Sequence, residues 1–167
     1  MFRKPLEERL IDRLRRLIDR FIKVLDEDDS ISAIRSDIRE AENNILIFSP
    51  FVDIRLERTK KILNELKGAI DRGVKVKVVI KHGLHPSSLK ALRNAGVEVY
   101  TRDIHAKAVI IDDYKVIYIG SSNILASYGK EDVMLRITGL MGEMIPKILS
   151  KKLFEKIKSP KEEEKIT

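Results

Sequence analysis

Two short stretches of the sequence combine residue types that could act on a phosphate group. The first is His105-Ala106-Lys107, which continues through apolar residues to Asp112, and the second is Gly120-Ser121-Ser122-Asn123. An imidazole can attack phosphorus or carry a proton, while an ammonium group is a fixed positive charge. Serine and asparagine add neutral hydrogen-bond donors, and glycine allows another segment to approach closely. Together these groups meet the needs of a phosphate site.

The spacing predicts that the two stretches meet. His105 and Lys107 are two residues apart along an apolar strand expected over residues 106–111, so both side chains leave the same face. A hairpin turn at Asp112-Asp113-Tyr114 would bring residues 120–123 back beside them. A lone histidine on such a strand is more often a core residue, but the second stretch in register favours a site. No carboxylate cluster accompanies it, so the sequence indicates neither a metal nor another cofactor.

The surrounding sequence predicts an α/β domain that would position these strands. Short apolar runs bounded by turn residues indicate strands, and stretches of helical periodicity lie between them. The expected strands cover residues 45–48, 74–80, 97–100, 106–111, 115–119 and 133–137, and the expected helices cover roughly 62–70, 87–95 and 141–157. Strands separated by helices of this length imply βαβ units and a mainly parallel sheet.

The sequence begins with a stretch that predicts an amphipathic helix over roughly Pro5–Leu25. Its apolar residues recur at steps of four and three, and arginines occupy much of the remaining surface. The acidic run at 26–29 would end it, and Asp29 or Ser30 could cap a second helix. Such a helix packs on its own domain by default, although a partner chain or a membrane surface is an alternative. We expect three parts: the helix and acidic turn at 1–29, the domain at 30–158, and a disordered charged tail at 159–167.

The composition is that of one folded domain with an excess of positive charge. The 167 residues are 43% hydrophobic and 35% charged, with a formal net charge of +7 and no cysteine. The charge favours polyanions, nucleic acid first and an anionic membrane second. The absence of cysteine fits a reducing cytoplasm, and the abundance of charged residues is typical of hyperthermophile proteins. No run approaches the roughly 20 apolar residues of a transmembrane segment.

The two stretches resemble the motif of the phospholipase D superfamily, which is His-x-Lys-x4-Asp followed by Gly-Ser-x-Asn. Residues 49–53, 72–76 and 92–97 are also similar to superfamily members that carry one copy of the motif, so the resemblance covers about residues 31–140. The segment between Asp112 and Gly120 is one residue longer than in the family, and the addition falls in the expected hairpin turn, where insertions are tolerated. The resemblance implies an αβα sandwich with a mixed, mainly parallel central sheet, preceded here by the N-terminal helix.

The resemblance also implies roles for the matching residues. His105 would attack phosphorus and form a covalent phosphohistidine, while Lys107 and Asn123 would hold the non-bridging oxygens with help from Ser121. Asp112 and Gly120 would be structural.

Other site residues are less closely fixed. The acidic residue that orients the histidine in the family would here be Glu131, with Asp132 as the alternative. Lys81 and His82 follow an expected strand, as Ser49 does, and could contact substrate backbone at the strand ends. His82 and His85 form only a weak metal pair, because no third ligand accompanies them.

The family mechanism uses two histidines, whereas this chain has one motif. A two-fold homodimer that shares one pocket would supply the second His105. The resulting hypothesis is a metal-independent, non-specific nuclease acting on DNA or RNA in the cytoplasm. The alternatives are a phospholipase or similar lipid phosphodiesterase, and a non-catalytic nucleic-acid-binding or regulatory module of a larger protein.

Overall fold

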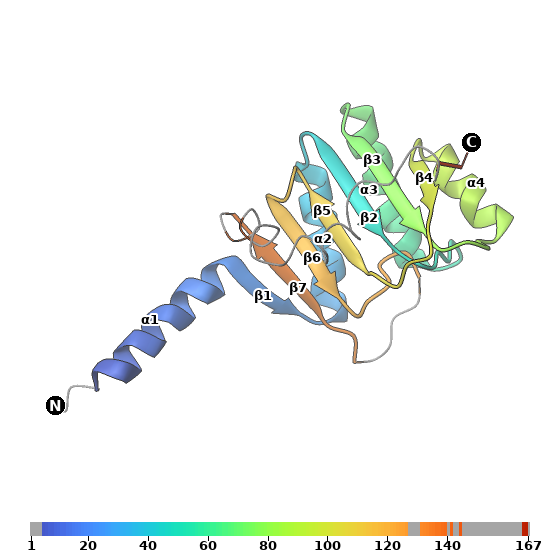
Figure 1. Cartoon of the computed structure of the whole chain (residues 1–167). Helices are drawn as coiled ribbons and strands as arrows, with labels where there is room; N and C mark the ends of the chain where they lie inside the picture. The colour runs from blue at the N-terminus through green and yellow to red at the C-terminus, as the bar shows by residue number, and fades with distance from the viewer. Residues whose placement is uncertain (1–4, 127–130, 140, 142–143, 145–164, 167) are drawn as a thin grey trace.

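The chain folds into four helices and seven strands within residues 5–126, 131–139, 141, 144 and 165–166, which are the residues that the computed structural model describes (Figure 1). In chain order these elements are α1 (Leu6–Phe21), β1 (Ile22–Leu25), α2 (Glu27–Glu40), β2 (Asn44–Phe48), α3 (Glu57–Asp71), β3 (Lys75–Ile80), α4 (Pro86–Asn94), β4 (Glu98–Thr101), β5 (Ala108–Ile111), β6 (Val116–Gly120) and β7 (Met134–Thr138).

All seven strands form one sheet in the order β1-β7-β6-β5-β2-β3-β4. The β2–β3 and β3–β4 pairs are parallel, as expected for strands joined through helices α3 and α4. The other four pairs are antiparallel. The predicted mixed α/β fold is confirmed, with one correction: the sheet is not mainly parallel. Among the described residues no crossover helix joins β5, β6 and β7, and consecutive strands joined in this way pair antiparallel.

The sheet buries apolar side chains on both of its faces. Helices α2 and α3 cover one face, where Ile34 and Leu66 pack with Ile47 and Val109 in the larger core (Figure 1). Phe48, Val79, Tyr100, Ala108 and Ile110 form a second apolar cluster. Strand β5 is the middle strand and is buried along its whole length. Both faces of β5 are therefore apolar, as is usual for a central strand that is buried on both sides.

The N-terminal segment differs from the prediction. The helix expected over Pro5–Leu25 ends at Phe21, and residues 22–25 instead form the edge strand β1, which pairs with β7. The acidic run does not end a helix but begins α2, because the Asp26 side chain accepts a hydrogen bond from the Asp29 N–H at 3.0 Å. The carboxylates at 27–29 then lie in the first turn of α2, where the helix dipole favours negative charge.

The C-terminal predictions are only partly within the described residues. The helix expected over 141–157 lies almost entirely outside them. In the tail that was expected to be disordered, Lys165 forms an antiparallel bridge with Tyr100, and the Ile166 N–H donates to the Val99 carbonyl at 2.9 Å. The prediction of disorder is therefore wrong for these two residues, which extend the sheet beside β4.

Candidate active site

The two halves of the motif lie side by side at one end of the sheet. Ala108 pairs with Ile119 in the β5–β6 hairpin, and the Gly120 N–H donates to the Lys107 carbonyl at 3.4 Å. The strand predicted from residue 106 begins only at Ala108, so His105 and Lys107 lie in the segment that leads into it. The first parts of β5 and β7 and the last parts of β2 and β6 meet at this end.

His105 and Lys107 are both accessible from solvent. The His105 side chain is exposed and Lys107 is partly exposed. The Lys107 Nζ donates to the carbonyl oxygen of His105 at 3.3 Å, which keeps the ammonium close to the histidine backbone. A base or nucleophile and a cation are therefore adjacent and open to a ligand.

Gly120 is required by the close approach of β6 and β7. A Cβ at this position would lie 2.1 Å from the Val133 carbonyl oxygen and 2.9 Å from the Met134 Cα, and neither backbone atom can move aside without separating the strands. The close backbone approach expected at this glycine is thus present, and it fixes the position of the residue that follows.

Ser121 continues the pairing beyond β6. Its N–H donates to the Val133 carbonyl and its Oγ accepts from the Val133 N–H, both at 3.1 Å. The side chain is on the surface, and no described residue accepts from its hydroxyl hydrogen, which can therefore donate to a ligand. The backbone contacts orient this donor beside the motif.

The loop that carries Asn123 is held by the segment between β2 and α3 and by the first turn of α3. The Asp53 N–H donates to the Leu125 carbonyl at 2.7 Å, and the Arg58 guanidinium donates to the Ala126 carbonyl. The Asn123 Oδ1 is buried and has no hydrogen-bond partner within the described residues. The backbone contacts of this loop therefore hold Asn123 in place, while its side-chain oxygen accepts no hydrogen bond from the described residues.

Arg58 supports the Asn123 loop, and the sequence did not reveal this contact. It also forms an ion pair with Glu27 at 2.8 Å, so it connects the start of α2 to the Asn123 loop. The acceptor in that loop is a backbone carbonyl, which carries no residue-specific signal. An arginine near the start of a helix resembles many others in this arginine-rich chain.

Asp112 lies at the far end of β5 from His105. Its side chain is 7% exposed and accepts hydrogen bonds from the N–H groups of Glu42, Asn43 and Asn44 at 2.7–3.2 Å. Burial alone would raise the pKa of this carboxyl group, but the three backbone donors favour the ionised form and lower the pKa below its usual value. The geometry is that of a carboxylate joining β5 to the loop before β2.

The peripheral candidates are arranged less uniformly. Ser49 is fully buried and donates to the Phe51 carbonyl at 2.8 Å, so its hydroxyl hydrogen is already used. Lys81 lies at the end of β3, and its Nζ is 3.8 Å from Asp103. His82 is exposed on the loop that follows. His85 caps α4 by accepting from the Ser87 N–H at 3.3 Å.

Glu131, the candidate for orienting the histidine, makes no contact with His105 of the kind this role requires. Glu131 is exposed, and the described part of the chain has no hydrogen bond or ion pair between it and His105. Across the same residues, no three His, Asp or Glu side chains are grouped as metal ligands. None of the helices within them is long and apolar enough to span a bilayer.

Comparison with known proteins identifies a family. The family model described as "Cardiolipin synthase, PLD-like domain" matches residues 34–138, which contain both halves of the motif. No curated protein matches the sequence significantly.

Solved structures of similar fold include phospholipase D family members. Nuc from Salmonella typhimurium aligns over 81% of this chain and 90% of its own, with 21% identity and a TM-score of 0.60. NucT from Helicobacter pylori aligns over 87% and 97%, with 19% identity and a TM-score of 0.60. TrmBL2, an archaeal chromatin protein described as having a novel mode of DNA binding, aligns over 90% and 60%, with 17% identity and a TM-score of 0.53. At these identities the likeness shows a shared fold.

Proposed function

The chain belongs to the phospholipase D superfamily through its PLD-like domain, and from this membership we propose that it is a metal-independent nuclease acting on DNA or RNA through His105. The observation that carries the proposal is the pairing of β5 with β6, which sets Lys107 beside Gly120 and leaves His105 exposed next to them. An exposed nucleophile, a fixed cation and oriented neutral donors are what phosphoryl transfer requires of a protein.

In the proposed reaction, an imidazole nitrogen of His105 attacks the phosphorus atom. The bond from phosphorus to the leaving oxygen breaks, and a second histidine gives its proton to that oxygen. The neutral second histidine then takes a proton from water, whose oxygen attacks phosphorus and releases His105. Lys107, Asn123 and Ser121 would stabilise the charge on the non-bridging oxygens throughout. Glu131 would orient one histidine only if its exposed side chain moves toward His105.

A nucleic-acid substrate is favoured by charge. The net charge of +7 suits a polyanion, and the DNA binding named for TrmBL2 occurs on a chain of related fold. Lys81 and His82, at the end of β3, would contact the backbone phosphates on either side of the scissile one. Ser49 would act through its bond to Phe51 and not by direct contact, since its hydroxyl is engaged.

The test is cleavage of single- and double-stranded DNA, RNA and phospholipid vesicles with EDTA present throughout. We expect cleavage of nucleic acid, loss of several orders of magnitude in rate in His105→Ala, and little change in the matched control His85→Asn, which keeps a capping side chain at the start of α4. Cleavage of phospholipid alone would identify a lipid phosphodiesterase. Nucleic-acid binding without cleavage would identify a binding module, and either result would overturn the nuclease proposal.

The second histidine is proposed to come from another copy of the chain. Under this arrangement, His105→Ala chains in excess should suppress wild-type activity well beyond dilution, because each mixed dimer has only half of the acid–base pair. Activity that remains proportional to the wild-type chain concentration would refute the shared site.

A further inference from the structure

Phe51 is an exposed aromatic residue in the loop that follows β2. Its side chain is 57% exposed and belongs to neither of the two apolar clusters of the fold. The other aromatic side chains in the described part of the chain are buried or partly buried. Single exposed apolar residues are common on proteins, so what distinguishes Phe51 is its place in the fold and the way its backbone is held.

Phe51 and His105 lie at the same end of the sheet. Phe48 pairs with Ala108, and Phe51 and His105 each lie three residues beyond this pair. Three residues span at most about 11 Å, so the ring and the proposed nucleophile are within reach of one short strand of nucleic acid.

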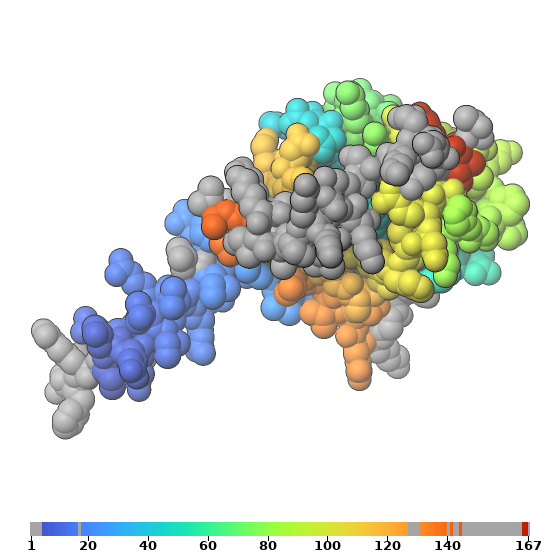
Figure 2. All heavy atoms as spheres, viewed as in Figure 1, coloured from blue at the N-terminus to red at the C-terminus, as the bar shows by residue number. Residues whose placement is uncertain are grey.

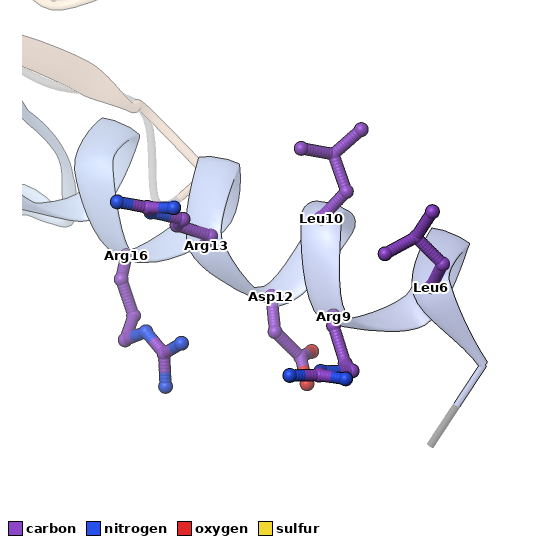
Figure 3. Close-up of a pocket in the computed structure, with 6 residues that line it drawn as sticks. All are labelled: Leu6, Arg9, Leu10, Asp12, Arg13 and Arg16. Atoms are coloured by element: carbon purple, nitrogen blue, oxygen red, sulfur yellow. The ribbon is translucent and has the colours of Figure 1, made fainter. Parts of the chain in front are cut away.

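The exposed apolar side chains of α1 lie elsewhere. Figure 2 shows α1 projecting from the rest of the molecule, and Figure 3 shows its side chains at Leu6 and Leu10. Ile22, which follows α1, pairs with Ile137 at the end of β1–β7 pairing that is farther from the start of β7. Since the start of β7 pairs with the end of β6, α1 leaves the sheet at the end opposite to His105 and takes no part in the surface around the motif.

Hydrogen bonds on both sides of Phe51 hold its loop against the site. The Pro50 carbonyl accepts from the Lys81 N–H at 3.2 Å, and the Asp53 N–H donates to the Leu125 carbonyl at 2.7 Å. The first bond joins the loop to the end of β3, and the second joins it to the loop that follows β6. Residue 51 is therefore held between two segments that carry proposed phosphate contacts.

The backbone of Phe51 is also fixed directly. Its carbonyl oxygen accepts from the Ser49 hydroxyl at 2.8 Å, and Ser49 is fully buried. An aromatic side chain has few rotatable bonds, so on a fixed backbone it loses little conformational entropy when a ligand covers it. The ring is therefore an exposed apolar surface that is already positioned for a flat partner.

We propose that Phe51 stacks on a nucleobase close to the cleaved phosphate, and that the preferred substrate is therefore single-stranded DNA or RNA. This inference rests on the nuclease function proposed above. Stacking needs an unpaired base, because the bases of a duplex present only their edges in the grooves. An aromatic ring stacks on every kind of base, which agrees with a site that reads phosphate and not sequence.

Binding by an uncleaving chain tests the stacking. In a His105→Ala background, Phe51→Ala should weaken the binding of a short labelled single-stranded DNA about 10-fold in fluorescence anisotropy. Binding of the same sequence as a duplex should not change. A strand of equal length that lacks bases should bind equally to both chains, because only its phosphate backbone remains.

Conservative variants separate stacking from simple apolar contact. Phe51→Leu keeps an apolar side chain without a flat ring and should bind the single strand as weakly as Phe51→Ala, whereas Phe51→Tyr should retain the binding. The chain has no tryptophan, so Phe51→Trp introduces a single indole. Its fluorescence should be quenched by the single strand, but not by the duplex or by the strand without bases.

The outcomes distinguish this inference from the nuclease proposal. Equal binding of the single strand with and without Phe51→Ala would overturn the stacking role alone. Phe51-dependent binding of single strands by a chain that never cleaves them would overturn the nuclease alone, and no binding of nucleic acid by the wild type would overturn both.

Three further results would assign the ring to another role and overturn the stacking. Weaker binding of the duplex or of the strand without bases in Phe51→Ala would indicate a general loss of the site. Binding to phosphatidylglycerol vesicles that is lost in Phe51→Ala would indicate insertion into a membrane. A lower mass of Phe51→Ala in sedimentation velocity would place the ring in a subunit interface.

Discussion

Replacing Asp112 by asparagine should destabilise the fold without impairing the chemistry. The carboxylate accepts from three backbone N–H groups, at 2.7 Å from Asn43 and 3.1–3.2 Å from Glu42 and Asn44. Hydrogen bonds to a charged group contribute about 1.5–3 kcal/mol each when fully buried. Glu42 and Asn43 are exposed, so water can replace much of the hydrogen bonding that their N–H groups lose in the variant. Asparagine also keeps one acceptor oxygen. We therefore expect a loss of about 2 kcal/mol in the free energy of unfolding.

Asparagine is the right substitution because of the backbone at this turn. Asp112 has a φ of 49°, and asparagine tolerates this left-handed conformation better than alanine does. The neighbouring Asp113, with a φ of 54° and an exposed carboxylate that accepts from the Asn44 side chain at 3.0 Å, provides a matched control. Asp113→Asn should change the stability by about 0.5 kcal/mol or less.

The contribution of Asp112 to the free energy of unfolding should depend on pH in a defined direction. The pKa of Asp112 is lowered in the folded state, so the carboxylate stabilises the fold at all pH values above its unfolded pKa of about 3.9. That stabilisation is lost as the pH falls through the folded pKa. The difference between the wild type and Asp112→Asn should therefore be constant from about pH 5 to 8 and shrink in more acidic solution.

Urea unfolding at several pH values, followed by cleavage per folded molecule at neutral pH, would measure both effects. Three results would refute the reasoning: equal stability of Asp112→Asn and Asp113→Asn, a stability difference that persists undiminished at low pH, or a loss of more than about tenfold in rate per folded molecule. Such a loss of rate would show that Asp112 takes part in the reaction.

Three further outcomes follow from contacts elsewhere in the sheet and from the charge. Gly120→Ala should unfold the protein or lower its melting temperature strongly, because the new methyl group meets the Val133 carbonyl at 2.1 Å; a thermal melt that matches the wild type would contradict the close β6–β7 contact. Arg136→Ala should cost about 3 kcal/mol in urea unfolding, because it leaves the buried Asp37 carboxylate without its ion pair at 2.7 Å, while Arg136→Lys should restore part of that loss; equal effects would argue against the paired geometry. Binding of duplex DNA to the His105→Ala chain should weaken with salt at a log–log slope of about −0.9 per phosphate contacted, and salt-insensitive binding measured by fluorescence anisotropy would exclude a backbone-reading site.

Local sequence rules predicted most of the elements that support the site. Residues 44–48, 75–80 and 98–101 are strands within a residue or so of expectation, and the helices between them end two residues before Gly73 and Gly96, which both have a positive φ. The hairpin was also predicted, although its first strand starts at Ala108 and not at residue 106. Each of these elements is specified by its own apolar pattern and turn residues.

The elements that were mispredicted depend on distant partners. Residues 22–25 continue the helical apolar pattern of α1, but they form a strand because β7 offers an edge for pairing. The choice between helix and strand here depends on pairing with residues more than a hundred positions away. Local propensity therefore could not predict it. Similarly, the bonds from Asp53 to Leu125 and from Arg58 to Ala126 use backbone carbonyls, whose position depends on the completed fold.

Strand β1 has a consequence for the order in which the sheet assembles. The β5–β6 hairpin joins residues separated by a short turn, whereas β1 must pair with a strand near the other end of the described chain. Closing so long a loop is slow and entropically costly, so the hairpin that carries the motif can form long before the edge strand docks. During synthesis, α1 and β1 emerge first and wait until β7 has been made. In the native state the same edge should be the first to open, and amide hydrogen exchange should be fastest in β1 among the seven strands, while the strands bearing the motif stay protected.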